Sequence, residues 1–219
     1  MPEAIFFDLD GTLADTAPDL GAALNLLLAE QGRQTVAQAL LRPHVSAGAR
    51  GLLQAGFGLL PGDPAYPALH TRFLDLYEGA LCSATTLFPG MAELLDELEA
   101  RAIAWGVVTN KPARFTLPLM AALGLADRAA AIVSGDTTAR AKPDPLPLFH
   151  ACELAGVAPA AAAYVGDDLR DIQAGRAAGM RTLVAAWGYL GDGLPMEQWG
   201  ADHLVDRPAA VLAALDGSA

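Results

Sequence analysis

The sequence predicts a doubly wound α/β fold with a mostly parallel sheet and an inserted α-helical segment. Short segments that are apolar throughout alternate along the chain with segments of helical character. Strands without a polar face are typical of parallel sheets that helices cover on both sides. The alternation is interrupted once, between residues 16 and 81, and then resumes. A chain of 219 residues is long enough for one such core plus a smaller inserted unit.

Six segments are expected to form the strands of a Rossmann-type core, because each is apolar rather than alternating. They are Ala4–Phe7, Ile103–Thr109, Ala130–Ser134, Ala162–Gly166, Arg181–Ala185 and a short one at Asp202–Val205. Helices are expected between them, since several of the intervening segments begin near Pro and end at Gly. Their expected ranges are Pro89–Arg101, Pro112–Gly124, Pro145–Gly156, Asp168–Gly179 and Pro208–Leu215.

The interruption at residues 16–81 contains no convincing strand. It begins with Thr16 and Asp19, which are spaced as in a helix capping box with Asp in place of Glu. Apolar residues at helical spacing follow at Leu20, Ala23, Leu24, Leu27 and Leu28. We therefore expect a core of residues 1–15 and 82–219, with residues 16–81 inserted as a helical cap.

The composition restricts the classes of partner. The formal net charge is −11, and only two of the 14 basic residues are lysines, Lys111 and Lys142. Without a basic patch, neither nucleic-acid binding nor attachment to an anionic membrane surface is expected. No apolar stretch approaches the length of a membrane span. Cys82 and Cys152 are isolated, as free thiols of a reducing cytosol are. We expect a cytoplasmic monomer or homodimer that binds a small molecule.

Two aspartates directly after the first predicted strand carry the clearest chemical signal. Asp8 and Asp10 follow the apolar run Ile5–Phe7, and the period of a strand places both on the same side of the chain. Two like charges this close are unfavourable alone but favourable around a divalent cation and a phosphate. A strand that ends in an Asp-Gly turn is the plainer interpretation of the same residues.

Two further segments place a hydroxyl and a lysine near strand ends or helix starts. One apolar strand ends in Thr109 and Asn110, where a hydroxyl and backbone N–H groups can hold phosphoryl oxygens without adding charge. A simple cap of the strand end is the alternative role for this threonine. Lys142 precedes a Pro-rich helix start, where either a site residue or a solvated surface lysine fits.

The run Gly166–Asp171 follows another apolar strand and holds three carboxylates. Asp167 fits a metal ligand, and Asp171 fits a carboxylate that orients a ligand or a neighbouring cation. Asp168 fits a helix N-cap. An acidic helix N-terminus is the alternative for the whole run.

The four motifs, in this order, resemble those of the haloacid dehalogenase-like hydrolases, and the resemblance covers essentially the whole chain. It implies phosphoryl transfer through an aspartyl-phosphate, in which Asp8 attacks phosphorus and Asp10 serves as general acid and base. It also implies Mg²⁺ held by Asp8, the Asp10 carbonyl and Asp167. The other roles it implies are charge stabilisation by Thr109 and Lys142, substrate contacts from Gly11, Thr12 and Asn110, and support of Lys142 or metal-bound water by Asp171.

The resemblance also narrows the chemistry. Relatives that dehalogenate lack the second aspartate, so Asp10 argues against that reaction. Relatives that hydrolyse phosphonates use a cap lysine, and residues 16–81 contain none. A sugar-phosphate mutase remains open because it uses the same two aspartates. A non-catalytic phosphate-binding protein is the non-enzyme alternative, but such a protein would not need the acid at Asp10.

The arrangement is most similar to bacterial phosphoglycolate phosphatases. Two segments depart from their usual pattern, GDDLRDI at residues 166–172 and SAGAR at residues 46–50, and both are similar to phosphatases of N-acetylmuramate 6-phosphate. Substrate choice is expected to lie in the cap. Arg50 can bind a substrate carboxylate bidentately, or can be an ordinary exposed arginine. His44 can assist there or lie in a surface loop.

Overall fold

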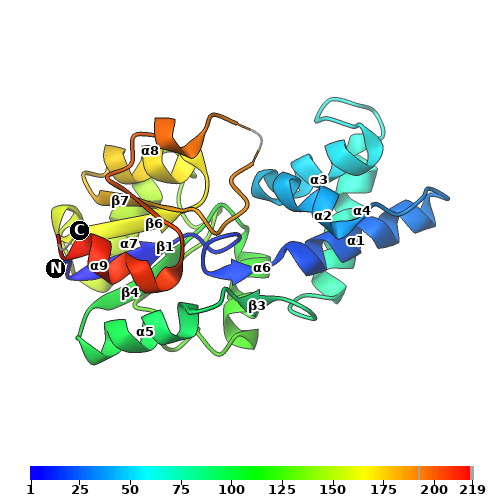
Figure 1. Cartoon of the computed structure of the whole chain (residues 1–219). Helices are drawn as coiled ribbons and strands as arrows, with labels where there is room; N and C mark the ends of the chain where they lie inside the picture. Colours follow the sequence, from blue (N-terminus) through cyan, green and yellow to red (C-terminus); the bar gives the residue numbers. More distant parts are fainter. Residues whose placement is uncertain (192, 218–219) are drawn as a thin grey trace.

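The described residues form a parallel six-stranded sheet at the centre of the core in this computed structural model (Figure 1). The structure describes residues 1–191 and 193–217. The strand order is β5-β4-β1-β6-β7-β8, and every neighbouring pair is parallel. The strands are β1 (Ala4–Phe7), β4 (Ala104–Val108), β5 (Ala131–Val133), β6 (Ala162–Gly166), β7 (Arg181–Ala185) and β8 (His203–Val205). The doubly wound α/β fold expected from the sequence is confirmed.

Helices cover both faces of this sheet. Alternate residues of β1 belong to two different buried clusters: Ile5 and Phe7 pack on one face and Phe6 on the other. The first face is covered by α5 (Met91–Ala100), α6 (Ala113–Ala122) and α9 (Val211–Leu215), and the second by α7 (Leu146–Ala155) and α8 (Leu169–Ala177). The helix expected at Pro208–Leu215 is split, because its first three residues form a 3-10 turn before α9.

The position of β1 in the sheet determines which loops meet. β1 lies between β4 and β6, and Phe7 is opposite Val107 and Val165. Because all three strands are parallel, the residues that follow them emerge at one edge of the sheet. Asp8, Thr109 and Asp167 are therefore brought together, although they are far apart in the sequence.

A helical cap lies beside this carboxyl edge (Figure 1). Its elements are α1 (Ala17–Glu30), α2 (Gln38–Leu41), the 3-10 helix η1 (Arg42–Ala47), α3 (Gly48–Phe57) and α4 (Tyr66–Gly79). They enclose a buried cluster that includes Leu24, Leu27 and Phe73 of the cap and continues onto Phe115 and Tyr189 of the core. Most of the helical stabilisation in such a unit comes from this packing rather than from intrinsic propensity.

Two short strands join the cap to the core. β2 (Ala14–Asp15) and β3 (Thr86–Leu87) pair antiparallel at the two crossings of the chain, a small sheet that the sequence did not predict. Arg42 of the cap pairs with Asp15 at 2.9 Å. The exact boundaries of the cap, expected at residues 16 and 81, stay a prediction. The β2–β3 pair lies near both of these boundaries.

The start of α1 differs from the capping box that the sequence suggested. The Thr16 side chain makes no cap hydrogen bond, and its hydroxyl donates to Asp10 instead. The buried carboxylate of Asp19 accepts the backbone N–H groups of Ala84 and Thr85 and the Thr85 hydroxyl. The expected box was wrong because both side chains are used by long-range contacts that local spacing cannot reveal.

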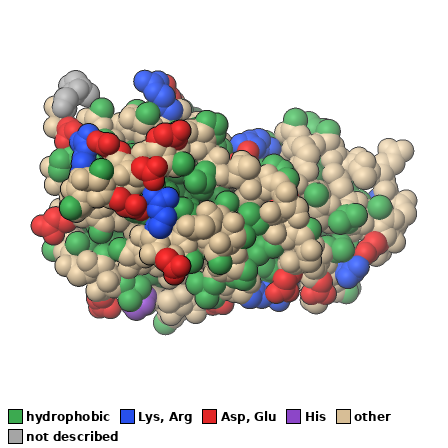
Figure 2. Space-filling view, turned by 90° about the horizontal axis from the view of Figure 1, so that it is seen from below, with side chains coloured by type: hydrophobic (Ala, Val, Ile, Leu, Met, Phe, Trp, Pro, Cys, Tyr) green, Lys and Arg blue, Asp and Glu red, His purple; other side chains and the backbone are tan. Residues whose placement is uncertain are grey.

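The surface carries scattered charges. Figure 2 shows one face on which basic side chains stand singly or beside acidic ones. Several are paired, such as Arg128 with Asp96 and Glu99 on the side of α5. Within the described residues, no helix is long and apolar enough to cross a membrane.

Asp19→Ala is expected to destabilise the protein by roughly 2–4 kcal/mol, because three donors of the returning chain lose a charged acceptor. Urea unfolding measures this difference. Asp75→Ala, at an exposed position of α4, is the control and should stay within about 0.5 kcal/mol of the parent. Equal stability of the two variants would contradict the structural role of Asp19.

Candidate active site

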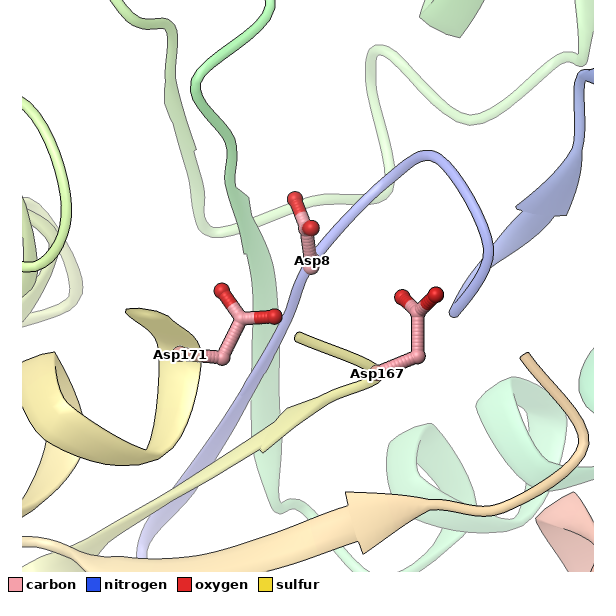
Figure 3. A group of neighbouring side chains, drawn as sticks. All are labelled: Asp8, Asp167 and Asp171. Atoms are coloured by element: carbon pink, nitrogen blue, oxygen red, sulfur yellow. The ribbon is translucent and has the colours of Figure 1, made fainter. Parts of the chain in front are cut away.

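Three aspartates converge at the carboxyl edge of the sheet (Figure 3). Asp8 follows β1, Asp167 follows β6 and Asp171 lies in the first turn of α8. One carboxylate oxygen from each lies within 4.8 Å of the other two. Asp167 and Asp171 are each only 1% exposed, so their charges are screened little by water.

A buried lysine lies among these carboxylates. The Nζ of Lys142 is 2.9 Å from Asp8 and 2.7 Å from Asp171, and it donates to the Tyr164 hydroxyl at 2.7 Å. Burial alone lowers the pKa of Lys142, but the charges of Asp171 and Asp8 outweigh burial and raise it. Lys142 therefore stays a cation in the site, as the sequence interpretation required.

Asp167 is held by neutral donors only. Its oxygens accept the Thr12 hydroxyl at 2.7 Å and the backbone N–H of Tyr189 at 2.9 Å. Among the described residues, no cationic side chain forms an ion pair with it. Burial, together with the charges of Asp8 and Asp171, raises the pKa of Asp167 well above its ordinary value.

This chemistry fits a divalent cation. Carboxylates are the hard oxygen donors that Mg²⁺ takes, and a cation beside Asp167 would offset the charge that burial leaves uncompensated. Asp171 differs, since one of its oxygens contacts Lys142 and the other accepts the Asp168 N–H at 3.1 Å. Asp8 and Asp167 are thus the better candidates for direct ligands, and Asp171 for a supporting carboxylate.

Gly11 and Thr12 contact Asp167, and neither of them lines the two cavities that the described residues form between the cap and the core. Gly11 has a positive φ of 87°, and a Cβ there would lie 2.2 Å from an oxygen of Asp167. The loop after β1 can approach this carboxylate so closely only with glycine. The structure therefore gives both residues a positioning contact with Asp167, and the substrate contact expected from the sequence stays a prediction.

Asp10 is held by a second buried lysine, to which the sequence interpretation assigned no role. The Nζ of Lys111 lies 3.0 and 3.3 Å from the two oxygens of Asp10. It also lies 4.6 Å from the ring centroid of Tyr77, on the cap helix α4. Its one sequence signal was the rarity of lysine, since both lysines of the chain are in the site.

Thr109 and Asn110 line a cavity between the cap and the core, and part of their hydrogen-bonding capacity is already used within the protein. The Thr109 hydroxyl accepts the backbone N–H of Lys111 at 3.2 Å. The Asn110 side chain pairs with the backbone of Lys142, donating at 2.9 Å and accepting at 3.0 Å. Asn110 thus fixes the segment that carries Lys142, which the sequence alone did not suggest.

Asp168 caps α8, as the sequence predicted. Its carboxylate accepts the backbone N–H of Arg170 at 2.9 Å, and Asp171 completes a capping box. Arg170 adds a bidentate ion pair with Asp168, at 2.8 Å for each contact. Although burial alone raises the pKa of Asp168, the Arg170 guanidinium brings it below its ordinary value.

Among the described residues, two cavities lie between the cap and the core. The first, of about 300 Å³, is lined by Asp8, Asp10, Thr109, Asn110, Lys111, Lys142 and Asp171, with aromatic residues of the cap opposite. The second, of about 540 Å³, is lined by Arg50 and His44. The structure therefore brings the core motif residues together around the first cavity. Arg50 lies outside this cavity, as an exposed side chain of the second one.

Tyr189 was missed by the sequence interpretation. It follows β7, and its hydroxyl accepts the N–H of Ala17 at 2.9 Å and donates to Asp15 at 3.0 Å. The backbone N–H of the same residue reaches Asp167. Tyr189 thus connects the cap junction to the acidic cluster, and no local motif around it could have indicated this.

Residues 5–185 match the family model described as haloacid dehalogenase-like hydrolase. The chain belongs to this family. The hydrolase is 43% identical over 215 residues to the N-acetylmuramic acid 6-phosphate phosphatase of Pseudomonas putida, covering 98% of this chain and 96% of that protein. It is 46% identical over 208 residues to the phosphoglycolate phosphatase of Xanthomonas campestris pv. campestris, covering 94% and 93%.

A solved structure agrees with the whole fold of this hydrolase, cap included. The predicted phosphoglycolate phosphatase from Haemophilus somnus has a TM-score of 0.84 at 28% identity, covering 97% of each chain. The family resemblance inferred from the four motifs is confirmed.

Mg²⁺ is expected to raise the thermal unfolding temperature of the hydrolase, since a ligand at 100 times its Kd stabilises by about 2.7 kcal/mol. The Asp167→Asn variant should lose most of this response, because the substitution removes the one buried carboxylate of the cluster that has no cationic partner among the described residues. Asp96→Asn, on the surface of α5, should keep it. A full response in Asp167→Asn would place the metal elsewhere.

Proposed function

We propose that this hydrolase is a Mg²⁺-dependent phosphatase that cleaves a small phosphomonoester through an aspartyl-phosphate. The observation that supports it most is the meeting of Asp8, Lys142 and Asp167 at one sheet edge. Asp8 and Lys142 also line one cavity together with Asp10. A nucleophile, a general acid, a fixed cation and a metal ligand set are the components that phosphoryl transfer requires. The phosphatase relatives support the same reaction.

Asp8 is the proposed nucleophile. Its Oδ1 accepts the Leu9 N–H at 2.8 Å and contacts Lys142 at 2.9 Å, so Oδ2 is the better placed oxygen to attack phosphorus. Lys142 and the Thr109 loop stabilise charge on the transferring group. Mg²⁺ bound at Asp8, the Asp10 carbonyl and Asp167 would supply further charge neutralisation.

Asp10 is the proposed general acid and base. It carries the second carboxylate of the motif, and Lys111 and Thr16 fix its orientation. In this position it would give a proton to the leaving alkoxide and later take one from the hydrolytic water. A non-catalytic phosphate-binding protein would need neither this acid nor the two groups that hold it.

The proposed substrate carries a carboxylate beside its phosphate. The substrates named for the two relatives, 2-phosphoglycolate and N-acetylmuramate 6-phosphate, share that pair of groups. We propose 2-phosphoglycolate, the smaller of the two, as the main substrate and N-acetylmuramate 6-phosphate as the alternative. Both choices agree with the resemblances of the sequence motifs. We also propose a cytoplasmic enzyme, since Cys82 and Cys152 are both free thiols.

Asp8→Asn is expected to abolish hydrolysis, and Asp10→Asn to slow it by about 10² to 10⁴, the range for a lost general acid. Phosphate release from 2-phosphoglycolate and N-acetylmuramate 6-phosphate, with Mg²⁺, measures both losses. Asp96→Asn is the surface control and should match the parent. Near-normal turnover by Asp8→Asn would exclude covalent catalysis by this residue.

Lys111→Met should harm esters with poor leaving groups more than p-nitrophenyl phosphate. Lys111 orients Asp10, and proton donation matters most when the leaving alkoxide is strongly basic. We expect the loss of kcat to be roughly tenfold larger with an alkyl ester such as 2-phosphoglycolate than with p-nitrophenyl phosphate. Arg114→Met, an exposed cation close by on α6, should change neither. Equal losses on both esters would instead assign Lys111 to phosphate binding or folding.

A further inference from the structure

The two segments that depart from the usual phosphoglycolate phosphatase pattern meet in space. Ser46 belongs to the cap segment SAGAR, and Asp168 and Arg170 belong to GDDLRDI. The Arg170 Nη2 donates to the Ser46 carbonyl at 2.8 Å, and the Ser46 hydroxyl donates to Asp168 at 3.3 Å. Residues separated by more than 120 positions thus form one unit across the cap–core boundary.

Arg170 is held in one orientation by this unit. Its Nε and Nη2 are used by the bidentate pair with Asp168 and by the Ser46 carbonyl. Its Nη1 has no hydrogen-bond partner among the residues that the structure describes. A guanidinium that is already fixed through two of its nitrogens loses little side-chain freedom when the third binds an anion.

Arg170 lies at the boundary between the two cavities. Arg170 lines the cavity that holds Asp8 and Asp10, and it also lines the larger cavity beside it. Ser46, Ala47 and Asp168 are shared between the two cavities in the same way. A substrate whose phosphate is at Asp8 can therefore extend past Arg170 into the second cavity.

We infer that Arg170 binds the carboxylate of the substrate's leaving group and that the second cavity accepts the bulk of this group. The inference rests on the proposed phosphatase function and names the residue that selects its substrate. An N–H of Nη1 would make a charge-assisted hydrogen bond to the carboxylate, inside a partly closed space. Asp168 and Ser46 serve as positioning residues for this contact.

Arg170 is better placed than Arg50, the arginine that the sequence analysis offered as a candidate for the same role. Arg50 is exposed and lines the second cavity but not the first. It forms no ion pair with the described residues and is not fixed by a carboxylate. Binding a carboxylate there would cost the ordering of a long, mobile side chain.

Matched esters separate recognition of the carboxylate from folding of the site. N-acetylmuramate 6-phosphate is compared with N-acetylglucosamine 6-phosphate, which lacks the lactyl carboxylate. In the same way, 2-phosphoglycolate is compared with 2-hydroxyethyl phosphate. For Arg170→Met we expect kcat/KM to fall roughly 10- to 100-fold on the carboxylated ester that the parent prefers, and less than about threefold on its partner.

Three variants accompany this measurement. Arg176→Met removes an exposed arginine from the same helix and should leave the ratio of the two esters unchanged. Asp168→Asn keeps an acceptor for the helix cap but loses the charge that fixes Arg170, so it should lower the same ratio by a smaller factor. It also provides the test if Arg170→Met does not fold, as circular dichroism would show. Arg50→Met tests the rival arginine.

Equal losses of Arg170→Met on both members of a pair, or no loss, would overturn the inference. A selective loss in Arg50→Met alone would also overturn it and assign the role to Arg50. The proposed function fails in a different way, with no phosphomonoester hydrolysed by the parent or with activity retained in Asp8→Asn. That result would remove the phosphatase and the inference together.

Discussion

The site depends on one buried cation. Lys142 contacts Asp8 and Asp171 in a place where little water can screen charge, and without it three carboxylates would meet at one sheet edge with no cation among them. The surrounding structure is arranged to keep this lysine in place. Asn110 holds its backbone, while the Val108 carbonyl and the Tyr164 hydroxyl accept from its Nζ.

Each of the two lysines of the chain forms an ion pair with one of the two motif aspartates. Lys142 is paired with the proposed nucleophile Asp8, and Lys111 with the proposed acid Asp10. Asp167 is left with neutral donors, and its charge is the one that a divalent cation would balance. The proposed binding of a phosphate by a protein with a net charge of −11 is consistent with this arrangement, because both lysines of the chain lie where the anion would bind.

The cap contributes to both ends of the proposed substrate. Thr16 and Tyr77 lie against the Asp10–Lys111 pair, and Ser46 lies against Arg170. The contact with Arg170 joins the segment after β6, which holds the proposed metal ligand Asp167, to the cap segment at residues 46–50. Specificity therefore need not be a property of the cap alone, because a core arginine that the cap orients can share it.

The sequence by itself determined the α/β fold, the helical insertion, the four motif loops and the cap of α8 at Asp168. These follow from local properties, namely apolar runs, helical spacing and carboxylates at strand ends. Only the tertiary structure decided the partners: Lys111 on Asp10, Tyr189 on Asp167, Asp19 on the returning chain, and Arg170 rather than Arg50 beside the first cavity. Such pairs join residues that are distant in the sequence, so their energies depend on the packing of the cap on the sheet, which no local pattern encodes.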